Sequence, residues 1–357
     1  MSYKFTFNSS IVHHLQTIER IRESLRTIML PPVLAEQLRS QAQLRATHYS
    51  TRIEGNRLTL KETEQVIQQG KLFPGRERDV KEVERFYRAL QQMETWVESG
   101  QRITEEKIRK LHAQIMRSQW VQPSPYRDGQ NVIRETNGQI VYLPPEAKDV
   151  PELMKELATW INAPDNDTPA PVIAGVAHYQ FETIHPFYDG NGRTGRLLTT
   201  WILYQGGYDL GKFYALEEFY AQDLEGYYQA LVTHPHHNYY EGRNKADITP
   251  WLEYFLRGMA SVFETVSSQI QKEARQEDLP RDNALLRKLD HRARRALSLF
   301  ADQEAIQSAQ VARLLGLSDR QARDLLLHWV GQGWLEMADP SRKARKYRLA
   351  KEYEDLV

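Results

Sequence analysis

Cysteine is absent from the 357 residues of this chain, so no disulfide can stabilise it. A chain without cysteine suits a reducing compartment, and we therefore expect a cytoplasmic protein. Long apolar runs are also absent. No stretch approaches the roughly eighteen apolar residues of a membrane-spanning helix, and the N-terminus lacks the apolar core of a signal peptide. We accordingly expect no membrane partner.

The chain has no excess of either charge, since 47 Lys and Arg balance 47 Asp and Glu. The molecule as a whole is therefore no general binder of polyanions. Internal repeats and low-complexity tracts are absent as well. The length is sufficient for two or three modules with a large core.

The most informative segment runs from His185 to Arg196 and reads HPFYDGNGRTGR. Apolar spacing predicts a buried helix over 172–184 before it and a second helix after it. The glycines therefore lie just ahead of a helix N-terminus, where free N–H groups and the helix dipole favour an anion. Gly190 and Gly192 allow the backbone to approach a phosphate closely.

The charged residues of the segment point to the same chemistry. Arg193 and Arg196 are three residues apart and can reach one anion together. Asp189 suits Mg²⁺, which prefers a carboxylate together with phosphate oxygens. His185 is suited to accept a hydroxyl proton. The segment thus predicts a site that binds a polyphosphate and transfers part of it to a nucleophile, the alternative being a glycine-rich turn with a surface arginine pair.

This segment resembles the signature of the Fic family, His-x-Phe-x-Asp/Glu-Gly-Asn-Gly-Arg-x-x-Arg, and fills every specified position. The resemblance implies a mainly helical bundle with a β-hairpin flap. It also implies a protein adenylyltransferase that moves AMP from ATP to a Ser, Thr or Tyr hydroxyl of a target protein, and to itself, and releases diphosphate. The implied roles are a general base at His185, a Mg²⁺ ligand at Asp189, an anion site at Gly190, Asn191 and Gly192, and phosphate binding at Arg193 and Arg196.

Residues 50–56, STRIEGN, fit the inhibitory pattern of the same family, Ser/Thr-x-x-x-Glu-Gly/Asn, through Ser50 and Glu54. We expect an inhibitory helix at about 32–56. In the family this glutamate pairs with the second arginine of the signature, here Arg196, and takes the place of the γ-phosphate. Ordinary helix termination with a solvated Glu54 is the alternative. Because the same glutamate orients water for AMP removal in some relatives, a de-AMPylase also stays open.

A flap is expected at about 126–145, because Asn137-Gly138 is a strong two-residue hairpin turn between two short apolar strands. The resemblance implies that the flap aligns the target segment by main-chain pairing. A plain surface hairpin is the alternative. Tyr227 and Tyr228 match a family position near the adenine of ATP, with core packing as the alternative.

The rest of the chain is predominantly helical by its apolar spacing. The predicted helices cover 12–27, 34–54, 59–69, 80–99, 104–117 and 151–162, with a capping box at Thr59 and Glu62. We expect an N-terminal helical region at 1–100 and a catalytic core at 101–275. A polar segment near 273–283 is predicted to be a linker.

Residues 285–350 carry thirteen Lys or Arg against seven Asp or Glu, which sets them apart from the neutral whole. Helices at 292–302, from 308 and at 319–332, then strands at 333–337 and 346–349, predict a winged helix-turn-helix domain over 285–357. A winged helix used for protein contacts is the alternative. The expected DNA contacts are Arg320, Arg323, Arg342, Lys343 and Arg345.

Two further functions compete with a self-restrained adenylyltransferase. One is a DNA-binding transcription regulator whose core senses a nucleotide, and the other is the de-AMPylase that uses Glu54. A sensor needs only the anion site, so the base at His185 favours chemistry. The target, the modified residue and a possible homodimer are left open by the sequence.

Overall fold

The computed structural model describes residues 3–26, 28, 30–117, 122–134, 140–163, 167–276, 284–339, 341 and 345–357. The chain forms two compact units. Unit 1 consists of Met1–Glu23, Ala42–Leu210 and Tyr214–Val266, and unit 2 consists of Ser24–Gln41, Gly211–Phe213 and Ser267–Val357. Among the described residues, no helix combines the length and the apolarity that crossing a bilayer requires.

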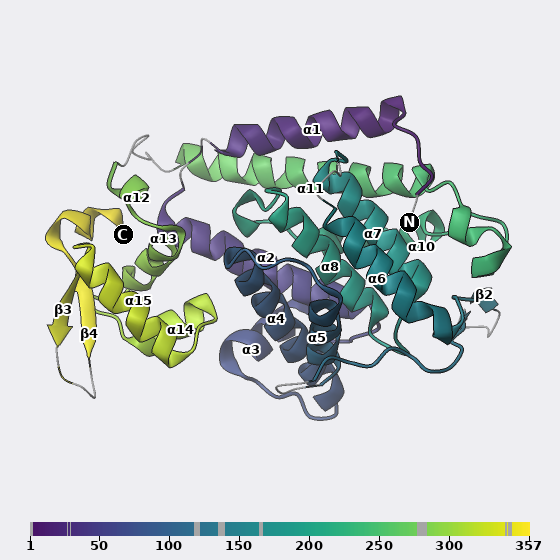
Figure 1. The fold of residues 1–357 in the computed structure, drawn as a ribbon. Coiled ribbons are helices and arrows are strands. Elements are labelled where there is room, and N and C mark those ends of the chain that lie inside the picture. Colours follow the sequence, from purple (N-terminus) through teal and green to yellow (C-terminus); the bar gives the residue numbers. More distant parts are fainter. Residues whose placement is uncertain are drawn as a thin grey trace. The chain divides into compact units, whose positions relative to one another are not determined.

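Helices dominate the described part of the chain (Figure 1). Their bounds up to the centre of the chain are α1 (Ser9–Arg26), α2 (Pro32–Ile53), α3 (Leu60–Gln69), α4 (Glu77–Glu98), α5 (Glu105–Met116), α6 (Val150–Ile161), α7 (Ala170–Ile184) and α8 (Asn191–Gln205). Every helix predicted in this region is present. The predicted capping box is also present, since Thr59 and Glu62 bond reciprocally at the start of α3.

Helices α7 and α8 pack against each other at the centre of unit 1, and α4 and α5 pack against α8. Nearly every residue of α7 is buried, because α6 packs against it and α11 (Thr249–Gln276) contacts it around Gly175. The approach of α11 is close at Gly175, whose carbonyl accepts a hydrogen bond of 2.7 Å from Trp251. A side chain at Gly175 would lie 2.8 Å from Leu252, so only glycine permits this packing.

The predicted flap contains two short antiparallel strands, β1 (Ile133–Arg134) and β2 (Ile140–Tyr142). Ile133 lies opposite Tyr142 in the register of this pair. The Asn137-Gly138 turn lies outside the described residues, so the turn type stays a prediction. Two short helices, α9 (Leu216–Gln222) and α10 (Leu224–Ala230), follow α8 in unit 1.

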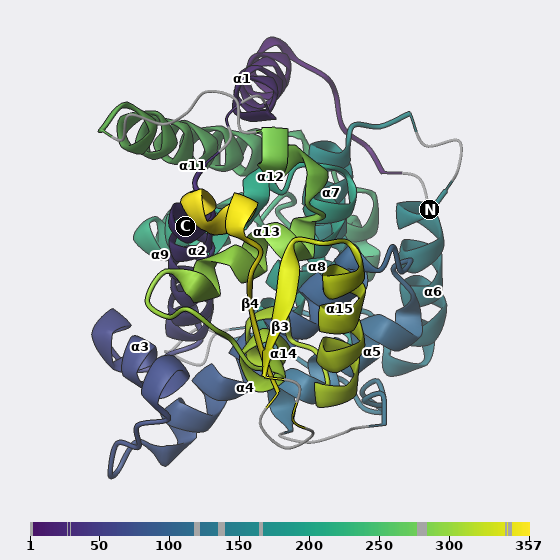
Figure 2. The ribbon, with the colours of Figure 1, turned by 90° about the vertical axis from the view of Figure 1, so that its left-hand side faces the viewer.

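Unit 2 contains α12 (Ala284–Lys288), α13 (His291–Leu297), α14 (Ser308–Leu315), α15 (Asp319–Gly331), β3 (Leu335–Asp339) and β4 (Lys346–Leu349). The strands pair antiparallel, and β3 packs on α15, as Figure 2 shows. Trp329, Trp334 and Tyr347 are buried in the core of this unit. The order of helix, helix and strand pair agrees with the predicted one, and the winged helix-turn-helix itself stays a prediction.

Two boundary predictions near unit 2 are wrong. Helix α11 continues to Gln276, so residues 273–276 are helical and not linker. One face of this helix stays apolar and buries Phe263, Val266 and Ile270. This burial stabilises the helix beyond the point at which its exposed residues become polar. The helix predicted over 292–302 ends at Leu297 and continues only as a 3₁₀ turn over Ser298–Phe300.

Candidate functional site

The segment from His185 to Gly190 joins the C-terminus of α7 to the N-terminus of α8. His185 adopts the left-handed conformation, with φ 49° and ψ 61°, and so ends α7. Gly190 has φ 78° at the N-cap of α8. A side chain at Gly190 would lie 2.7 Å from the sulfur of Met116, so this position requires glycine for two reasons.

His112 of α5 supports this segment, a role that the sequence did not indicate. Its ring stacks on the buried Phe187 with the ring centroids 3.6 Å apart. Its Nε2 lies 2.8 Å from the carbonyl oxygen of Asp189, and its Nδ1 lies 2.7 Å from the hydroxyl of Ser124. Burial lowers the pKa of His112 to about 4, so the ring is neutral at pH 7 and donates through Nε2.

Asn191 uses its side chain to close the segment on itself. Its Oδ1 accepts a hydrogen bond of 3.0 Å from the Phe187 amide, and its Nδ2 donates one of 2.8 Å to the Phe187 carbonyl. The residue is buried. An anion at this helix terminus would therefore meet the backbone of Asn191 and not its side-chain amide.

His185 lines a pocket of about 720 Å³ together with Glu182, Gly192 and Arg196. Burial lowers the pKa of His185 to about 4, so the imidazole is uncharged at pH 7 and free to accept a proton. Glu182 lies beneath it, with Oε2 3.9 Å from His185 Nδ1. Burial raises the pKa of Glu182 to about 8.

Arg127 holds the backbone at His185, which sequence reasoning also missed. Its guanidinium donates to the carbonyls of His185 at 3.0 Å, Gly129 at 3.1 Å and Pro145 at 2.5 Å. Its own amide donates to the carbonyl of Pro186 at 3.0 Å. This buried residue therefore connects both ends of the predicted flap to the loop that carries His185.

Arg196 lies on the first turns of α8 and is held by the end of α2. Its Nη2 donates to Glu54 Oε1 at 2.8 Å and to the Ser50 carbonyl at 2.9 Å, and its Nε donates to the Ser50 hydroxyl at 2.9 Å. Burial alone would lower the pKa of Arg196, but the adjacent Glu54 carboxylate raises it, so the guanidinium is charged. The side chain of Arg196 is 1% exposed and that of Glu54 25%.

The Glu54 carboxylate also lies against Gly192. A Cβ at this position would overlap Glu54 Oε1 and would lie 3.0 Å from Arg196 Nη1. The carboxylate therefore occupies the space above the first turn of α8, where N–H groups and an arginine would bind another anion. The ion pair that the resemblance implied between Glu54 and Arg196 is present.

Arg193 points to a different carboxylate. Its Nη1 forms an ion pair with Glu82 of α4, and its Nη2 lies 3.2 Å from Asp189 Oδ1. Asp189 also accepts a hydrogen bond of 2.6 Å from the Gly190 amide, and its side chain is 58% exposed. In the part of the chain that the structure describes, no cluster of three or more His, Cys, Asp or Glu could bind a metal ion unaided.

The two adjacent tyrosines differ in their surroundings. Tyr227 is buried, and its hydroxyl lies 2.8 Å from Nε2 of the buried His178. Tyr228 is 50% exposed. Both line the 720 Å³ pocket, together with Ile133 and Val141 of the flap strands. Tyr227 thus also belongs to the core, as the alternative interpretation held.

The residues predicted to contact DNA lie in unit 2. Arg320 and Arg323 are exposed on α15, where Arg323 donates to the Asp319 carbonyl at 3.0 Å. Arg345 directly precedes β4 and is partly buried. Arg342 and Lys343 lie outside the described residues.

Residues 102–203 match the model of the Fic/DOC family. A protein adenylyltransferase Fic of Nematostella vectensis is 26% identical over 249 residues, which cover 68% of this chain and 53% of the relative. One of Drosophila erecta is 28% identical over 197 residues, which cover 54% of this chain and 39% of the relative. The chain thus spans about half, or less, of the length of these curated relatives.

Solved structures give a similar result over a larger part of the chain. A Fic family protein from Desulfovibrio desulfuricans G20 is 27% identical with a TM-score of 0.61, covering 98% of this chain and 99% of its own. A Fic domain containing signaling protein from Bacteroides thetaiotaomicron VPI-5482 is 20% identical with a TM-score of 0.60, covering 74% of this chain and 97% of its own. The second likeness concerns the fold alone.

Proposed function

We propose that this chain, which carries a Fic/DOC family domain at residues 102–203, is a protein adenylyltransferase. It would transfer AMP from ATP to a Ser, Thr or Tyr hydroxyl of a target protein and of itself. The observation that supports this most is the uncharged His185 imidazole on the same pocket as Gly192 and Arg196. A base beside an anion site is needed for transfer and not for sensing alone. The adenylyltransferase relatives favour the same activity.

In the proposed reaction, His185 takes the proton from the target hydroxyl. The hydroxyl oxygen then attacks the α-phosphorus of ATP, and the bond from that phosphorus to the bridging oxygen breaks to release diphosphate. Backbone N–H groups at Gly190, Asn191 and Gly192 would hold the phosphates with Arg193. Arg196 would join them once it leaves Glu54.

Asp189 would hold a Mg²⁺ ion that arrives with the nucleotide. Its carboxylate is largely exposed, and Mg²⁺ in nucleotide sites is usually bound by one or two carboxylates with phosphate oxygens and water. A single carboxylate at this place therefore fits the ion. When bound, it would neutralise charge on the phosphates.

We infer that Glu54 restrains this site. A nucleotide that places a phosphate on Arg196 must displace the partly buried Glu54 carboxylate from an arginine that also donates two hydrogen bonds to Ser50. ATP that binds without this displacement would lack one phosphate contact and lie unproductively. Glu54 would also be placed to orient water, so removal of AMP stays an alternative activity.

For the remaining regions we propose a division into a helical region at 1–100 with an inhibitory helix at 32–56, a core at 101–275 with a flap at 126–145, and a winged helix-turn-helix at 285–357. Tyr228 would wall the adenine. The flap would align the target segment by main-chain pairing. The protein would act in the cytoplasm, and a homodimer is compatible with this proposal.

Transfer from ATP labelled at the α- or γ-phosphate tests the reaction. Wild type, Glu54→Gly and His185→Ala are incubated with each nucleotide in cell lysate, and protein label is read by autoradiography and mass spectrometry. We expect α-label on protein that is stronger in Glu54→Gly and absent in His185→Ala. Label from the γ-phosphate would indicate a kinase, and absence of label in Glu54→Gly would favour the nucleotide-sensing regulator. If AMP already attached to protein is removed, and this removal requires Glu54, the de-AMPylase would be favoured.

DNA binding by the C-terminal module is a second proposal, supported by the basic composition of residues 285–350 and the exposed arginines of α15. Such binding weakens steeply with salt because cations are released from the DNA. We expect a salt-dependent mobility shift that is lost in Arg320→Ala/Arg323→Ala. Its absence in wild type at low salt would contradict DNA binding and favour protein contacts.

A further inference from the structure

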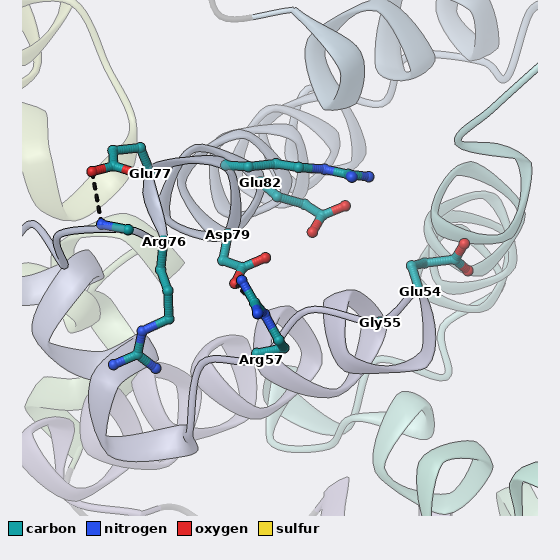
Figure 3. A pocket seen from close by; sticks show the side chains of 9 residues that line it. Glu54, Gly55, Arg57, Arg76, Glu77, Asp79 and Glu82 are labelled. Atoms are coloured by element: carbon teal, nitrogen blue, oxygen red, sulfur yellow. Dashed lines mark hydrogen bonds and ion pairs between the residues drawn. The ribbon is translucent and has the colours of Figure 1, made fainter.

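The two arginines of the anion site are held by different carboxylates from different helices. Arg196 pairs with Glu54 at the end of α2, and Arg193 pairs with Glu82 on α4. The side chain of Glu82 is 11% exposed and that of Glu54 25%, so the carboxylate of the second pair is more deeply buried than that of the first. Glu54 and Glu82 both line a cavity of about 280 Å³, and their side chains are labelled in Figure 3.

Glu82 is itself fixed from a second direction. Its Oε2 accepts a hydrogen bond of 2.9 Å from Asn56 Nδ2, while its Oε1 binds Arg193. Asn56 is buried, donates also to the Asp79 carbonyl at 3.0 Å, and accepts from the Leu58 amide at 3.1 Å. Both oxygens of Glu82 are therefore engaged, and one rotamer of the side chain is favoured.

The two ends of the Arg193 guanidinium differ in what they bind. Nη1 binds Glu82, whereas Nη2 binds Asp189 at 3.2 Å and lies 4.0 Å from the sulfur of Met116. Asp189 is exposed and is the residue proposed above to bind Mg²⁺. Once Asp189 turns to a cation, Nη2 loses its acceptor and needs another anion. The nearest anion would then be a phosphate of the nucleotide.

We propose that Glu82 is a positioning residue, which keeps Nη1 of Arg193 in place so that Nη2 is presented to the terminal phosphates of ATP. Glu82 stays in the bound state, because removing one partner of a buried ion pair leaves an uncompensated charge. This distinguishes Glu82 from Glu54, whose arginine must be released. Asn56 contributes by fixing the carboxylate of Glu82.

This inference rests on the proposed function, and a binding measurement separates the two. Isothermal titration calorimetry with ATP and with AMP, both in Mg²⁺, compares Glu54→Gly with Glu54→Gly/Glu82→Gln. The second variant keeps the shape of the side chain at residue 82, but it removes the charge and replaces one of the two accepting oxygens with an NH2 donor. Glu54→Gly/Glu84→Gln is the matched control, because Glu84 lies on the same helix, where it forms an ion pair with Arg88 at 3.8 Å.

We expect Glu82→Gln to weaken ATP binding by about tenfold, which corresponds to the loss of one charge-assisted contact, and to leave AMP binding within about twofold. Asn56→Ala in the same background is expected to weaken ATP binding by a smaller factor. Glu84→Gln is expected to change neither affinity. AMP serves as the reference because it lacks the two terminal phosphates.

Three results would overturn the proposal. Unchanged ATP affinity would mean that Arg193 needs no positioning by Glu82. Increased ATP affinity would mean that Glu82 inhibits the site by keeping Arg193 from ATP, as proposed for Glu54 and Arg196. An equal loss of ATP and AMP binding, with a lowered thermal midpoint, would mean a purely structural role. Failure of the adenylyl transfer would leave these affinities unaffected, so the two proposals fail independently.

Discussion

Glu54 Oε1 accepts a hydrogen bond from Arg196 Nη2 at 2.8 Å and at the same time lies where a side chain at Gly192 would stand. The carboxylate thus occupies the arginine and the open face of α8, the two features by which this helix terminus would bind another anion. The chain supplies an anion of its own to the place where we propose that ATP binds.

Gly192→Ala tests whether this open face is required. The backbone at Gly192 is helical, and Glu54→Gly removes the carboxylate that a Cβ would overlap, so in that background we expect alanine to be accommodated in the fold. The added methyl group would overlap the place of the bound anion. We therefore expect ATP affinity in the Glu54→Gly background to fall by about tenfold or more, measured by calorimetry. ATP affinity equal to that of the parent would refute the anion site above Gly192.

Arg127→Lys tests the support of His185. Lysine keeps the charge but cannot donate to three carbonyls in the geometry of the guanidinium. We expect kcat in the Glu54→Gly background to fall by about 100-fold, because a displaced base aligns poorly with its hydroxyl. ATP affinity should be unchanged, since the carbonyls to which Arg127 donates lie outside the proposed anion site. Equal losses of kcat and ATP affinity would show that Arg127 only maintains the fold.

Glu182→Gln tests the buried carboxyl beneath His185. Burial raises the pKa of Glu182 from 4.5 to about 8, although Arg196 opposes this rise and Glu54 adds to it. The folded protein therefore binds this proton more tightly than the unfolded chain does. The stabilisation is complete below about pH 4.5 and is lost as the pH rises through about 8.

Glutamine has no proton to lose, so the Glu182→Gln variant should gain stability over wild type as the pH rises. We expect the difference in unfolding midpoint between the variant and wild type to grow from pH 5 to pH 8, by on the order of 2–4 °C for each kcal/mol in a domain of this size. Differential scanning fluorimetry measures the difference. Glu84→Gln is the control, and a difference independent of pH would contradict the raised pKa.

Much of the site could be predicted because its parts are local in sequence. The spacing from His185 to Arg196 predicted the two helices on either side of the loop, and the resemblance implied the pairing of Glu54 with Arg196. His112, Arg127 and Glu82 could not be found in this way. They act through partners 58 to 111 residues distant, and nothing in their own neighbourhood indicates those partners.

In the fold, too, features that depend on nearby residues could be predicted from the sequence, and features that depend on distant residues could not. Helices with a clear apolar period and a cap were predicted well, as at Thr59. The helix end at Gln276 was missed because a long amphipathic helix keeps its buried face while its exposed residues become polar. Tyr227 and Tyr228 are adjacent on one helix, and only the tertiary structure decides which of them His178 contacts.

Tyr227→Phe and Tyr228→Ala separate the two tyrosines. Removing the Tyr227 hydroxyl leaves Nε2 of the buried His178 without its partner, so we expect a loss of about 1–3 kcal/mol in the free energy of unfolding and little change in ATP affinity. Tyr228→Ala removes an exposed wall of the pocket, so we expect a loss of ATP affinity of about threefold to tenfold at unchanged stability. Denaturant unfolding and ATP titration measure both effects, and the reverse pattern would contradict the assignment.

Above all, we propose that Glu54 keeps Arg196 from the nucleotide. The initial rate at which α-label from ATP enters protein tests it most directly, in wild type, Glu54→Gln and Glu54→Gly at equal protein concentration. A charge-assisted contact contributes about 1.5–3 kcal/mol. We therefore predict that Glu54→Gly is labelled at least about tenfold faster than wild type, and that the rate of Glu54→Gln lies between those of wild type and Glu54→Gly. Equal or lower rates in a Glu54→Gly protein that unfolds at the wild-type temperature would contradict the claim.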